Sequence, residues 1–419
     1  PRRPEPRTGP SRSEILRARY FNGLLDFAAM PKFPHTAASA GSLSDRVFSR
    51  LAARAKEHEG PIYPLHVGDT WMEPLEAARA EAQRTDAHPR LHNYAPVQGE
   101  PALLDAIEAH LKRRGECLVD RECVQVTSGA TAGLSVVAEA LLDPGDEVLL
   151  PAPFWPLIRG IIRKRGAKAV EVPFFDRLDD PEWDVEAALE AAVTEKTAAI
   201  YLNTPHNPTG RVLSDREVAA VAKVAERHDL WIWSDEVYEE LYFGFPPPPV
   251  WARSDFQTRC VAVHSMSKAY GLAGARVGWA HGPHEAMKAI RGVQTFSTYC
   301  APRPMQLGAA KALREGGEWL NRARRSYEDA AERTARTLGL PKPDGGTFVF
   351  FDVSAQRREG EDTLGLLERC LDAGVLLTPG AASGEAYESW VRLCFTSVEP
   401  ERLQEALDLI APIVGRDLG

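Results

Sequence analysis

The sequence predicts an α/β protein, in which helices cover both faces of a largely parallel sheet and a smaller α+β region follows. Between about residues 100 and 300, short apolar runs alternate with helical patterns, which is typical of parallel strands joined by helices. Beyond about residue 315 the pattern changes to a long charged helix and three strand-like runs. This change predicts a second, smaller unit at the C-terminal end.

Each apolar run of the first region is short enough to be a buried strand. The predicted strands of the large sheet cover residues 124–127, 147–151, 198–203, 230–236, 261–265 and 277–281. The long helix covers 318–339, and the later strands cover 347–353, 374–379 and 389–395, with a helix between the first two and another closing the chain. We expect the proline run at 246–249 to form a stiff surface loop.

Composition and charge limit the classes of partner. The chain has 419 residues, and its 44% hydrophobic content is enough for a packed core. A net charge of −9 with both signs interspersed gives no footprint for nucleic acid or a membrane surface, and no apolar run could span a bilayer. The six cysteines lack paired or metal-binding spacing. We therefore expect a cytoplasmic protein without a metal site that acts on small molecules.

Distinctive residues follow several predicted strands, and ligands collect beyond the carboxyl ends of parallel strands. Gly129, Ala130 and Thr131 open a helix whose N–H groups could hold a phosphate, although such residues also cap ordinary helices. Asn207 lies in TPHNPTG, where two prolines stiffen either a ligand-orienting loop or a plain turn. Asp235 ends an apolar strand, as a helix cap or as the partner of a buried cation.

The stretch HSMSKAYGLAGARVG places Lys268 just beyond another predicted strand. A lysine in a desolvated crevice has a lowered pKa and becomes a usable nucleophile and base, whereas the simpler interpretation is a surface lysine in a turn. Ser265 and Arg276 in the same stretch could clamp an oxyanion such as phosphate. An acyltransferase S-x-x-K box is disfavoured, because the S-D-N and K-T-G elements that accompany it do not occur.

Together these strand ends supply the groups that hold pyridoxal phosphate (PLP). The motifs SGAT, NTPHNPTG, SDEVY and SMSKAYGLAGARVGW have the order and spacing of the class I and II aminotransferases. From about Tyr63 to its C-terminus, the chain resembles this fold-type I family, the aspartate aminotransferase superfamily. The resemblance implies a PLP-binding domain at 63–312 with a mostly parallel seven-stranded sheet sandwiched by helices, and a small α+β domain at 313–419. Residues 1–62 would form a flexible N-terminal arm and a segment of the small domain.

The resemblance also implies roles for individual residues. Lys268 would carry the cofactor as a Schiff base, Asp235 would pair with its pyridine nitrogen, and Tyr238 would complete the catalytic set. Asn207 and Tyr238 would bond the phenolic oxygen, and Trp155 or its neighbour Phe154 would stack on the ring. The residues around the phosphate would be Gly129, Ala130, Thr131, Ser265 and Arg276.

The substrate would meet a second set of residues. Arg392 matches the arginine that grips the substrate α-carboxylate, although a cross-strand salt bridge is the plain alternative. Gly68 would lie over that carboxylate, with Asn207 and Trp155 beside it. Tyr94 matches the tyrosine that reaches the cofactor phosphate of the neighbouring subunit, which implies a homodimer with shared active sites.

The implied reaction transfers the amino group of an L-amino acid to a 2-oxo acid by a ping-pong mechanism. A lyase, decarboxylase or oxidase on the same scaffold is the alternative, because the fold does not fix the reaction. An inactive PLP-fold binding module is disfavoured, since every cofactor position holds a competent residue.

Three features of the sequence bear on the substrate. The lysine that one aspartate-specific subgroup carries near Thr131 does not occur here, which weakens an aspartate assignment. Arg291 lies near the position of the distal-carboxylate arginine of another subgroup, but basic residues are common in that helix. Ser383 precedes Gly384 where the family has an aromatic residue, which predicts an unusual side-chain pocket.

Overall fold

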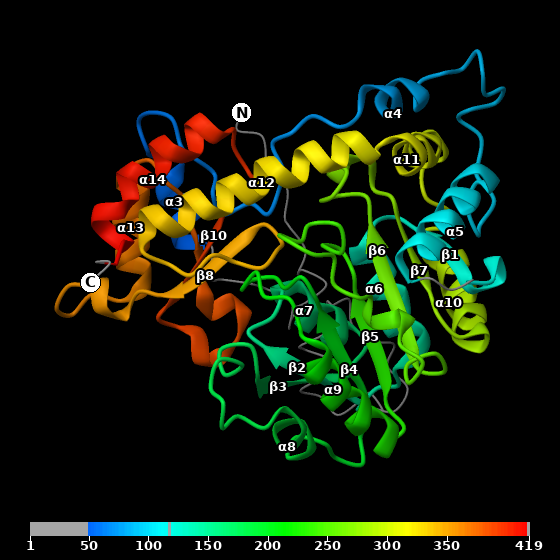
Figure 1. The fold of residues 1–419 in the computed structure, drawn as a ribbon, viewed down its shortest axis with the longest axis horizontal. Helices are drawn as coiled ribbons and strands as arrows, with labels where there is room; N and C mark the ends of the chain where they lie inside the picture. The colour runs from blue at the N-terminus through cyan, green and yellow to red at the C-terminus, as the bar shows by residue number, and fades with distance from the viewer. Residues whose placement is uncertain (1–48, 116–118, 417–419) are drawn as a thin grey trace, which may run out of the picture.

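The computed structural model describes residues 49–115 and 119–416, so the N-terminal part of the predicted arm lies outside the described residues. Its main feature is a seven-stranded sheet in the order β1-β7-β6-β5-β4-β2-β3, in which β7 runs antiparallel to both its neighbours (Figure 1). The strands are β1 (Val124–Thr127), β2 (Glu147–Ala152), β3 (Lys168–Pro173), β4 (Thr197–Asn203), β5 (Trp231–Asp235), β6 (Cys260–Ser265) and β7 (Gly278–His281).

The prediction of a mostly parallel seven-stranded sheet is confirmed, and six of its strands were located from their apolar runs. The exception is β3, whose sequence KAVEVP carries a lysine and a glutamate. This strand lies at the edge of the sheet and is only partly buried. An edge strand does not need the continuous apolar run that marks a strand covered on both faces.

Helices cover both faces of this sheet. One face packs against α6 (Ala130–Leu141), α7 (Pro156–Lys164) and α10 (His284–Ser297). The other face packs against α5 (Pro101–Gly115), α9 (Asp215–Arg227) and α11 (Arg303–Glu315). The shorter elements are α4 (Glu76–Glu81), α8 (Val185–Glu190), η2 (Arg121–Cys123), η3 (Val250–Ala252) and η4 (Ala273–Ala275).

A second core surrounds a small antiparallel sheet in the order β8-β10-β9. Its strands are β8 (Phe348–Asp352), β9 (Thr378–Pro379) and β10 (Trp390–Cys394). The helices around it are α3 (Ser49–Ala55), α12 (Gly317–Leu338), α13 (Thr363–Asp372) and α14 (Pro400–Val414), with η5 (Ser354–Gln356), η6 (Gly380–Ser383) and η7 (Glu385–Tyr387) in the connections. The predicted small α+β region is confirmed, while the domain boundaries at 62/63 and 312/313 remain predictions.

Only the last two residues of the predicted strand 374–379 belong to β9. The residues before them bond instead to the N-terminal segment, through a bridge between Tyr63 and Val375 and a hydrogen bond from Leu376 N to Tyr63 O. The sequence pattern marks this run as extended, but it cannot tell which segment will pair with it.

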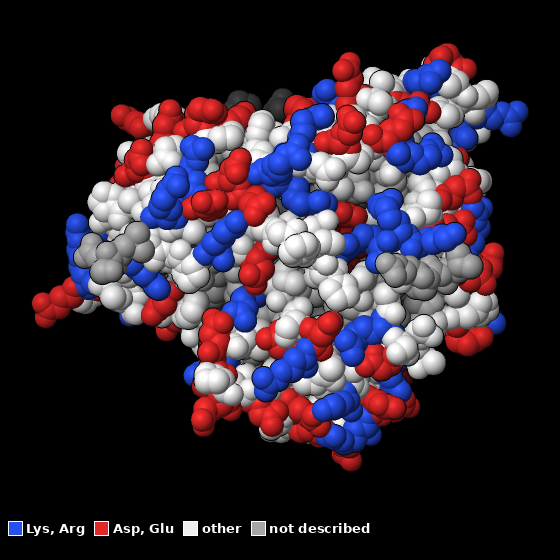
Figure 2. All heavy atoms as spheres, viewed as in Figure 1, with Lys and Arg blue, Asp and Glu red and all other residues white. Residues whose placement is uncertain are grey.

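Charged side chains of both signs are interspersed over the face of the molecule shown in Figure 2. Among the described residues, none of the helices is long and apolar enough to cross a bilayer. The carboxyl ends of β1, β4, β5 and β6 point to one edge of the large sheet, because the parallel pairings align Asn203 with Asp235 and Asp235 with Val263. The polar residues that follow these strands therefore meet at that edge.

Candidate active site

A pocket of about 220 Å³ lies where this sheet edge meets the small sheet. It collects eleven of the residues singled out from the sequence, which come from segments more than 300 positions apart. They are Gly68, Ala130, Thr131, Trp155, Asn207, Asp235, Tyr238, Ser265, Lys268, Arg276 and Arg392. Leu134, Asn203, Val237, Ser267, Ala273 and Phe348 complete the lining.

Asp235 is a buried carboxylate at the end of β5. Its Oδ2 accepts a hydrogen bond from the Tyr201 hydroxyl at 2.6 Å, and its Oδ1 accepts one from the Val237 N–H at 3.2 Å. Burial raises the pKa of Asp235 from 3.8 to about 6, although both hydrogen bonds act to lower it. No lysine, arginine or histidine of the described chain pairs with this carboxylate, so the site lacks the cation that a buried acid needs.

The opposite end of the pocket is suited to an anion. The helix α6 begins at Ala130, and no side chain caps its N-terminus. Gly129 has φ +81°, a backbone conformation that favours glycine, and a Cβ there would lie 2.5 Å from the Arg276 guanidinium. Arg276 donates to the Ala273 carbonyl at 2.8 Å and has no carboxylate partner among the described residues. Ser265 Oγ donates to Ser267 Oγ nearby at 2.9 Å, so N–H, hydroxyl and guanidinium donors converge here.

Lys268 reaches into the pocket between these two ends, and its amine donates to the Gly68 carbonyl oxygen. Burial lowers the pKa of Lys268, and the nearby Arg276 and Arg392 lower it further, against the opposing effect of Asp69. A larger fraction of such an amine is neutral, which is the form that acts as a nucleophile or base. The interpretation as an ordinary surface lysine is therefore wrong.

Arg392, on β10, brings a guanidinium from the small sheet. It donates to Asn207 Oδ1 at 3.1 Å and to the His66 carbonyl at 3.0 Å, and it lies 4.3 Å from the centre of the Phe348 ring. The Arg392 Nε has no hydrogen-bond partner, and the described chain provides no carboxylate for this cation. The cross-strand salt bridge considered from the sequence is not formed, so the pocket can accept a carboxylate from a ligand.

Asn207 also links this arginine to the sheet. Its Nδ2 donates to the Tyr238 hydroxyl at 3.4 Å, and its backbone N–H donates to Asn203 Oδ1 at 2.8 Å. Asn203 in turn donates to the Asp235 carbonyl at 2.8 Å. This chain of amides fixes the direction of the Asn207 side chain between Tyr238 and Arg392, so the loop is more than a plain turn.

Of Trp155 and Phe154, only Trp155 lines the pocket. Phe154 is fully buried and stacks with the Arg159 guanidinium at 4.9 Å. Tyr94 does not line the pocket of its own chain. Its side chain is 83% exposed, and its ring contacts that of Tyr299 at 5.2 Å.

Two residues considered for substrate selection also lie outside the pocket. Arg291 donates to the carbonyls of Glu122 and Val124 and to Gln125 Oε1, and it pairs with the Glu122 carboxylate at 3.2 Å. Ser383 is buried, and its carbonyl accepts the Phe154 N–H at 2.9 Å. Apart from Lys268, Arg276 and Arg392, no lysine or arginine of the described chain lines the pocket.

Comparisons with known proteins identify the family. The family model described as "Aminotransferase class I and II" matches residues 61–410. The chain belongs to the class I and II aminotransferase family. Members of the family depend on PLP, and this aminotransferase moves an amino group from an amino acid to a 2-oxo acid by the ping-pong mechanism that the family implies.

Relatives of this aminotransferase differ in substrate. The aspartate/prephenate aminotransferase of Thermus thermophilus is 32% identical, over 85% of this chain and 91% of its own. The arginine–pyruvate transaminase of Pseudomonas aeruginosa is 31% identical, over 92% and 98%. A Thermus thermophilus aspartate aminotransferase double mutant has a similar structure, with a TM-score of 0.83 and 28% identity over 91% of this chain and 100% of its own.

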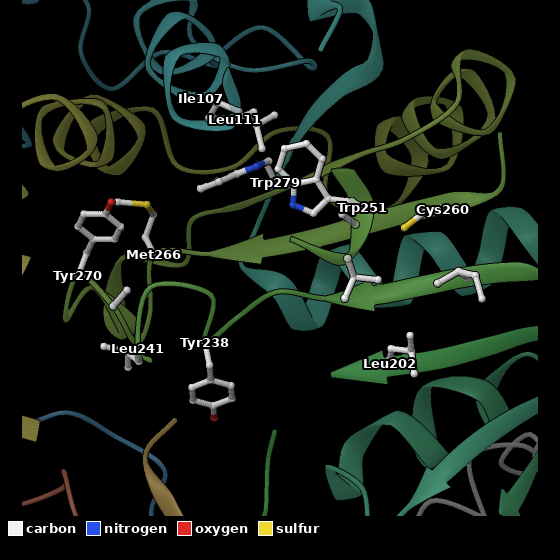
Figure 3. Close-up of a cluster of buried hydrophobic side chains, with 14 of the residues drawn as sticks. Ile107, Leu111, Leu202, Tyr238, Leu241, Trp251, Cys260, Met266, Tyr270 and Trp279 are labelled. Carbon is white, nitrogen blue, oxygen red and sulfur yellow. The ribbon is translucent and has the colours of Figure 1, made fainter. Parts of the chain in front are cut away.

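A buried polar cluster lies behind the site, within the apolar cluster shown in Figure 3 around Trp251 and Trp279. Glu239, directly after Tyr238, accepts hydrogen bonds at 2.9 Å from His110 and His264. His264 directly precedes Ser265, and its ring stacks on Trp279. Burial acts to raise the pKa of Glu239, but these histidines hold that pKa below its usual value. The cluster ties the segment of Tyr238 to that of Lys268.

The same three side chains have the residue types of a metal site, but their hydrogen bonds oppose that function. Arg113 donates to His110 Nδ1 at 2.9 Å, and a guanidinium can only donate. His110 therefore carries its proton on Nε2, the atom that faces Glu239 and that would have to bind a metal. The cluster is a directed hydrogen-bond chain from Arg113 through His110 to Glu239.

Sequence reasoning missed three residues of this aminotransferase site. Tyr201 and Asn203 lie on β4 and were counted only as part of an apolar run, although both bond Asp235. Phe348 packs under Arg392, and a Cβ at Gly68 would lie 2.6 Å from its ring. The alternation of side chains along β4 places Tyr201 on the same face as Asn203, but it does not show where the Tyr201 hydroxyl is directed.

We expect the unpaired Asp235 carboxylate to make the protein without PLP less stable than an Asp235→Asn variant at neutral pH. Because its folded-state pKa of about 6 exceeds its unfolded value, ionised Asp235 should destabilise the folded state by about 3 kcal/mol above pH 6. This cost disappears as the pH falls toward about 4, where the unfolded chain also binds the proton.

We expect the PLP-free variant to melt at a higher temperature than the PLP-free wild type at about pH 8, with the difference lost near pH 4. Calorimetry of both apoproteins across this range measures the difference. A wild type at least as stable as the variant throughout would show that Asp235 is not an unpaired buried charge.

Proposed function

We propose that this pocket binds PLP with its ring nitrogen at Asp235, its phosphate at the N-terminus of α6 and its reactive carbon at Lys268. The observation that carries the proposal is the unpaired Asp235 carboxylate at one end of the pocket and the unpaired Arg276 guanidinium at the other. A protonated pyridine nitrogen supplies the missing cation, and a phosphate supplies the missing anion. Gly129, Ala130, Thr131 and Ser265 complete the phosphate contacts in this proposal.

When bound, PLP supplies an electron-withdrawing ring that acidifies the Cα–H of an amino acid joined to it. Asp235 holds the proton on the ring nitrogen and so maintains the strength of that electron sink. Tyr238 and Asn207 donate toward the phenolic oxygen, and Trp155 covers the face of the ring. Lys268 Nζ moves the proton at the substrate Cα, which suits an amine whose pKa is lowered by burial.

Arg392 binds the substrate α-carboxylate in this arrangement. Its guanidinium is held by Asn207 and by the His66 carbonyl, so its direction is set before the substrate arrives. Gly68 leaves space above that carboxylate. Arg291 is paired with Glu122 and with backbone carbonyls. We therefore infer that it does not bind the distal carboxylate of a substrate in the active site of its own chain.

The first experiment follows the absorbance of the PLP-loaded protein while single amino acids are added without oxygen and without a keto acid. The expected result for the true donor is a visible band that bleaches once, with one equivalent of keto acid and of pyridoxamine phosphate formed. Lys268→Ala is the control and should not turn over.

Continuous release of ammonia, carbon dioxide or a leaving group, with the visible band restored, would assign a lyase or decarboxylase instead. Oxygen-dependent turnover in a parallel aerobic sample would assign an oxidase. A wild type that gives no band with PLP would contradict the whole assignment of the pocket.

We also propose a homodimer in which Tyr94 reaches the phosphate site of the partner subunit. Tyr94 is exposed and does not line the pocket of its own chain. Its ring contacts Tyr299, which closely follows α10, and Phe296 near the end of that helix is 93% exposed. These aromatic rings suit a surface covered by a second copy of the chain.

The free thiols of the described cysteines support a reducing compartment, and we propose that the protein is located in the cytoplasm.

Mixed dimers test the shared site. Lys268→Ala chains mixed with Tyr94→Ala chains form hybrids in which one site has both native residues, so about a quarter of wild-type activity should return at limiting PLP. Each variant alone should stay far below that level under the same conditions. A mixture no more active than the two variants measured separately would show that Tyr94 does not act across the interface.

A further inference from the structure

Tyr201 is a buried tyrosine behind the pocket whose hydroxyl has one partner. Its side chain is 2% exposed and lies within the apolar cluster on the α6 and α7 face of the sheet. The hydroxyl donates to Asp235 Oδ2 at 2.6 Å, shorter than an ordinary neutral hydrogen bond. Since a carboxylate only accepts, the tyrosine must be the donor.

The pairing of β4 with β5 holds this contact in place. Asn203 is opposite Asp235 in the parallel register, and Tyr201 is opposite Trp233. Tyr201 therefore reaches the carboxylate from the strand interior, while Val237 N–H binds the other oxygen from the loop that follows β5. Two donors on two different oxygens fix the plane of the carboxylate, which lines the pocket and keeps further lone pairs free to accept.

The hydroxyl also opposes the electrostatic effect of burial. Burial favours the neutral acid and raises the pKa of Asp235, whereas donation from Tyr201 stabilises the ionised form and lowers it. A neutral Asp235 could not hold a proton on a ring nitrogen by charge pairing. Removing the hydroxyl would therefore weaken the interaction of Asp235 with a cation without changing any residue that lines the pocket.

We propose that Tyr201 is a positioning residue that keeps Asp235 ionised and directed at the ring nitrogen of the cofactor. The inference rests on the proposed function, because it requires PLP in this pocket with its nitrogen at Asp235. The inference goes beyond the proposed function by assigning a role to a strand residue that touches neither cofactor nor substrate. The alternative is that Tyr201 only fills space in the core, which phenylalanine would do equally well.

The test is a double-mutant cycle read out by cofactor binding, independent of activity. Apoproteins of the wild type, Tyr201→Phe, Asp235→Asn and the double variant are titrated with pyridoxamine phosphate, which cannot bond covalently to Lys268. We expect Tyr201→Phe to raise the dissociation constant about tenfold, as for one hydrogen bond to a charged group, and Asp235→Asn to raise it roughly a hundredfold. On the Asp235→Asn background, Tyr201→Phe should change it less than about twofold.

Tyr387→Phe is the matched control. Tyr387 is also 2% exposed and donates to a carboxylate, Asp176 Oδ1, at 2.7 Å, but neither residue lines the pocket. Its loss should leave the dissociation constant unchanged, and thermal melts should show all the variants folded.

Two results would overturn the role of Tyr201. One is an unchanged dissociation constant for Tyr201→Phe, and the other is an equal increase with and without Asp235, which would indicate a packing effect. A wild type that does not bind pyridoxamine phosphate, or an Asp235→Asn variant that binds it as tightly, would instead contradict the proposed function.

Discussion

The site depends on a charge that its own chain leaves uncompensated. Asp235 ends a buried strand, and its two oxygens meet only neutral donors among the described residues. A buried carboxylate in this state destabilises a protein, because burial removes its hydration and no cation replaces it. In the proposed arrangement PLP supplies that cation, so its binding would stabilise the folded chain.

The rest of the architecture holds other groups at fixed positions around that charge. Parallel pairing of β4, β5 and β6 brings Asn203, Asp235 and Ser265 to one edge, and β10 adds Arg392 from the small sheet. Behind the edge, Glu239 and the two histidines that bond it join the loops on either side. Site residues thus lie at the ends of rigid elements, and buried hydrogen bonds determine their directions.

Much of this arrangement was predictable, because strands buried on both faces leave continuous apolar runs and the polar residues after them stand out. The predictions failed where the structure depends on partners that are distant in sequence. The edge strand β3 lacked an apolar run, and residues 374–376 paired with an N-terminal segment. Tyr201 was read as a core residue because its hydrophobic character says nothing about where its hydroxyl is directed.

The most direct test of the account is to locate the covalent bond between the protein and its cofactor. PLP-loaded protein is reduced with borohydride, which makes the bond to the attached amine permanent, and its peptides are mapped by mass spectrometry. The account predicts one phosphopyridoxyl group per chain, on Lys268, with labelling blocked by an amino acid donor. A group spread over surface lysines, or carried by another single lysine, would contradict it.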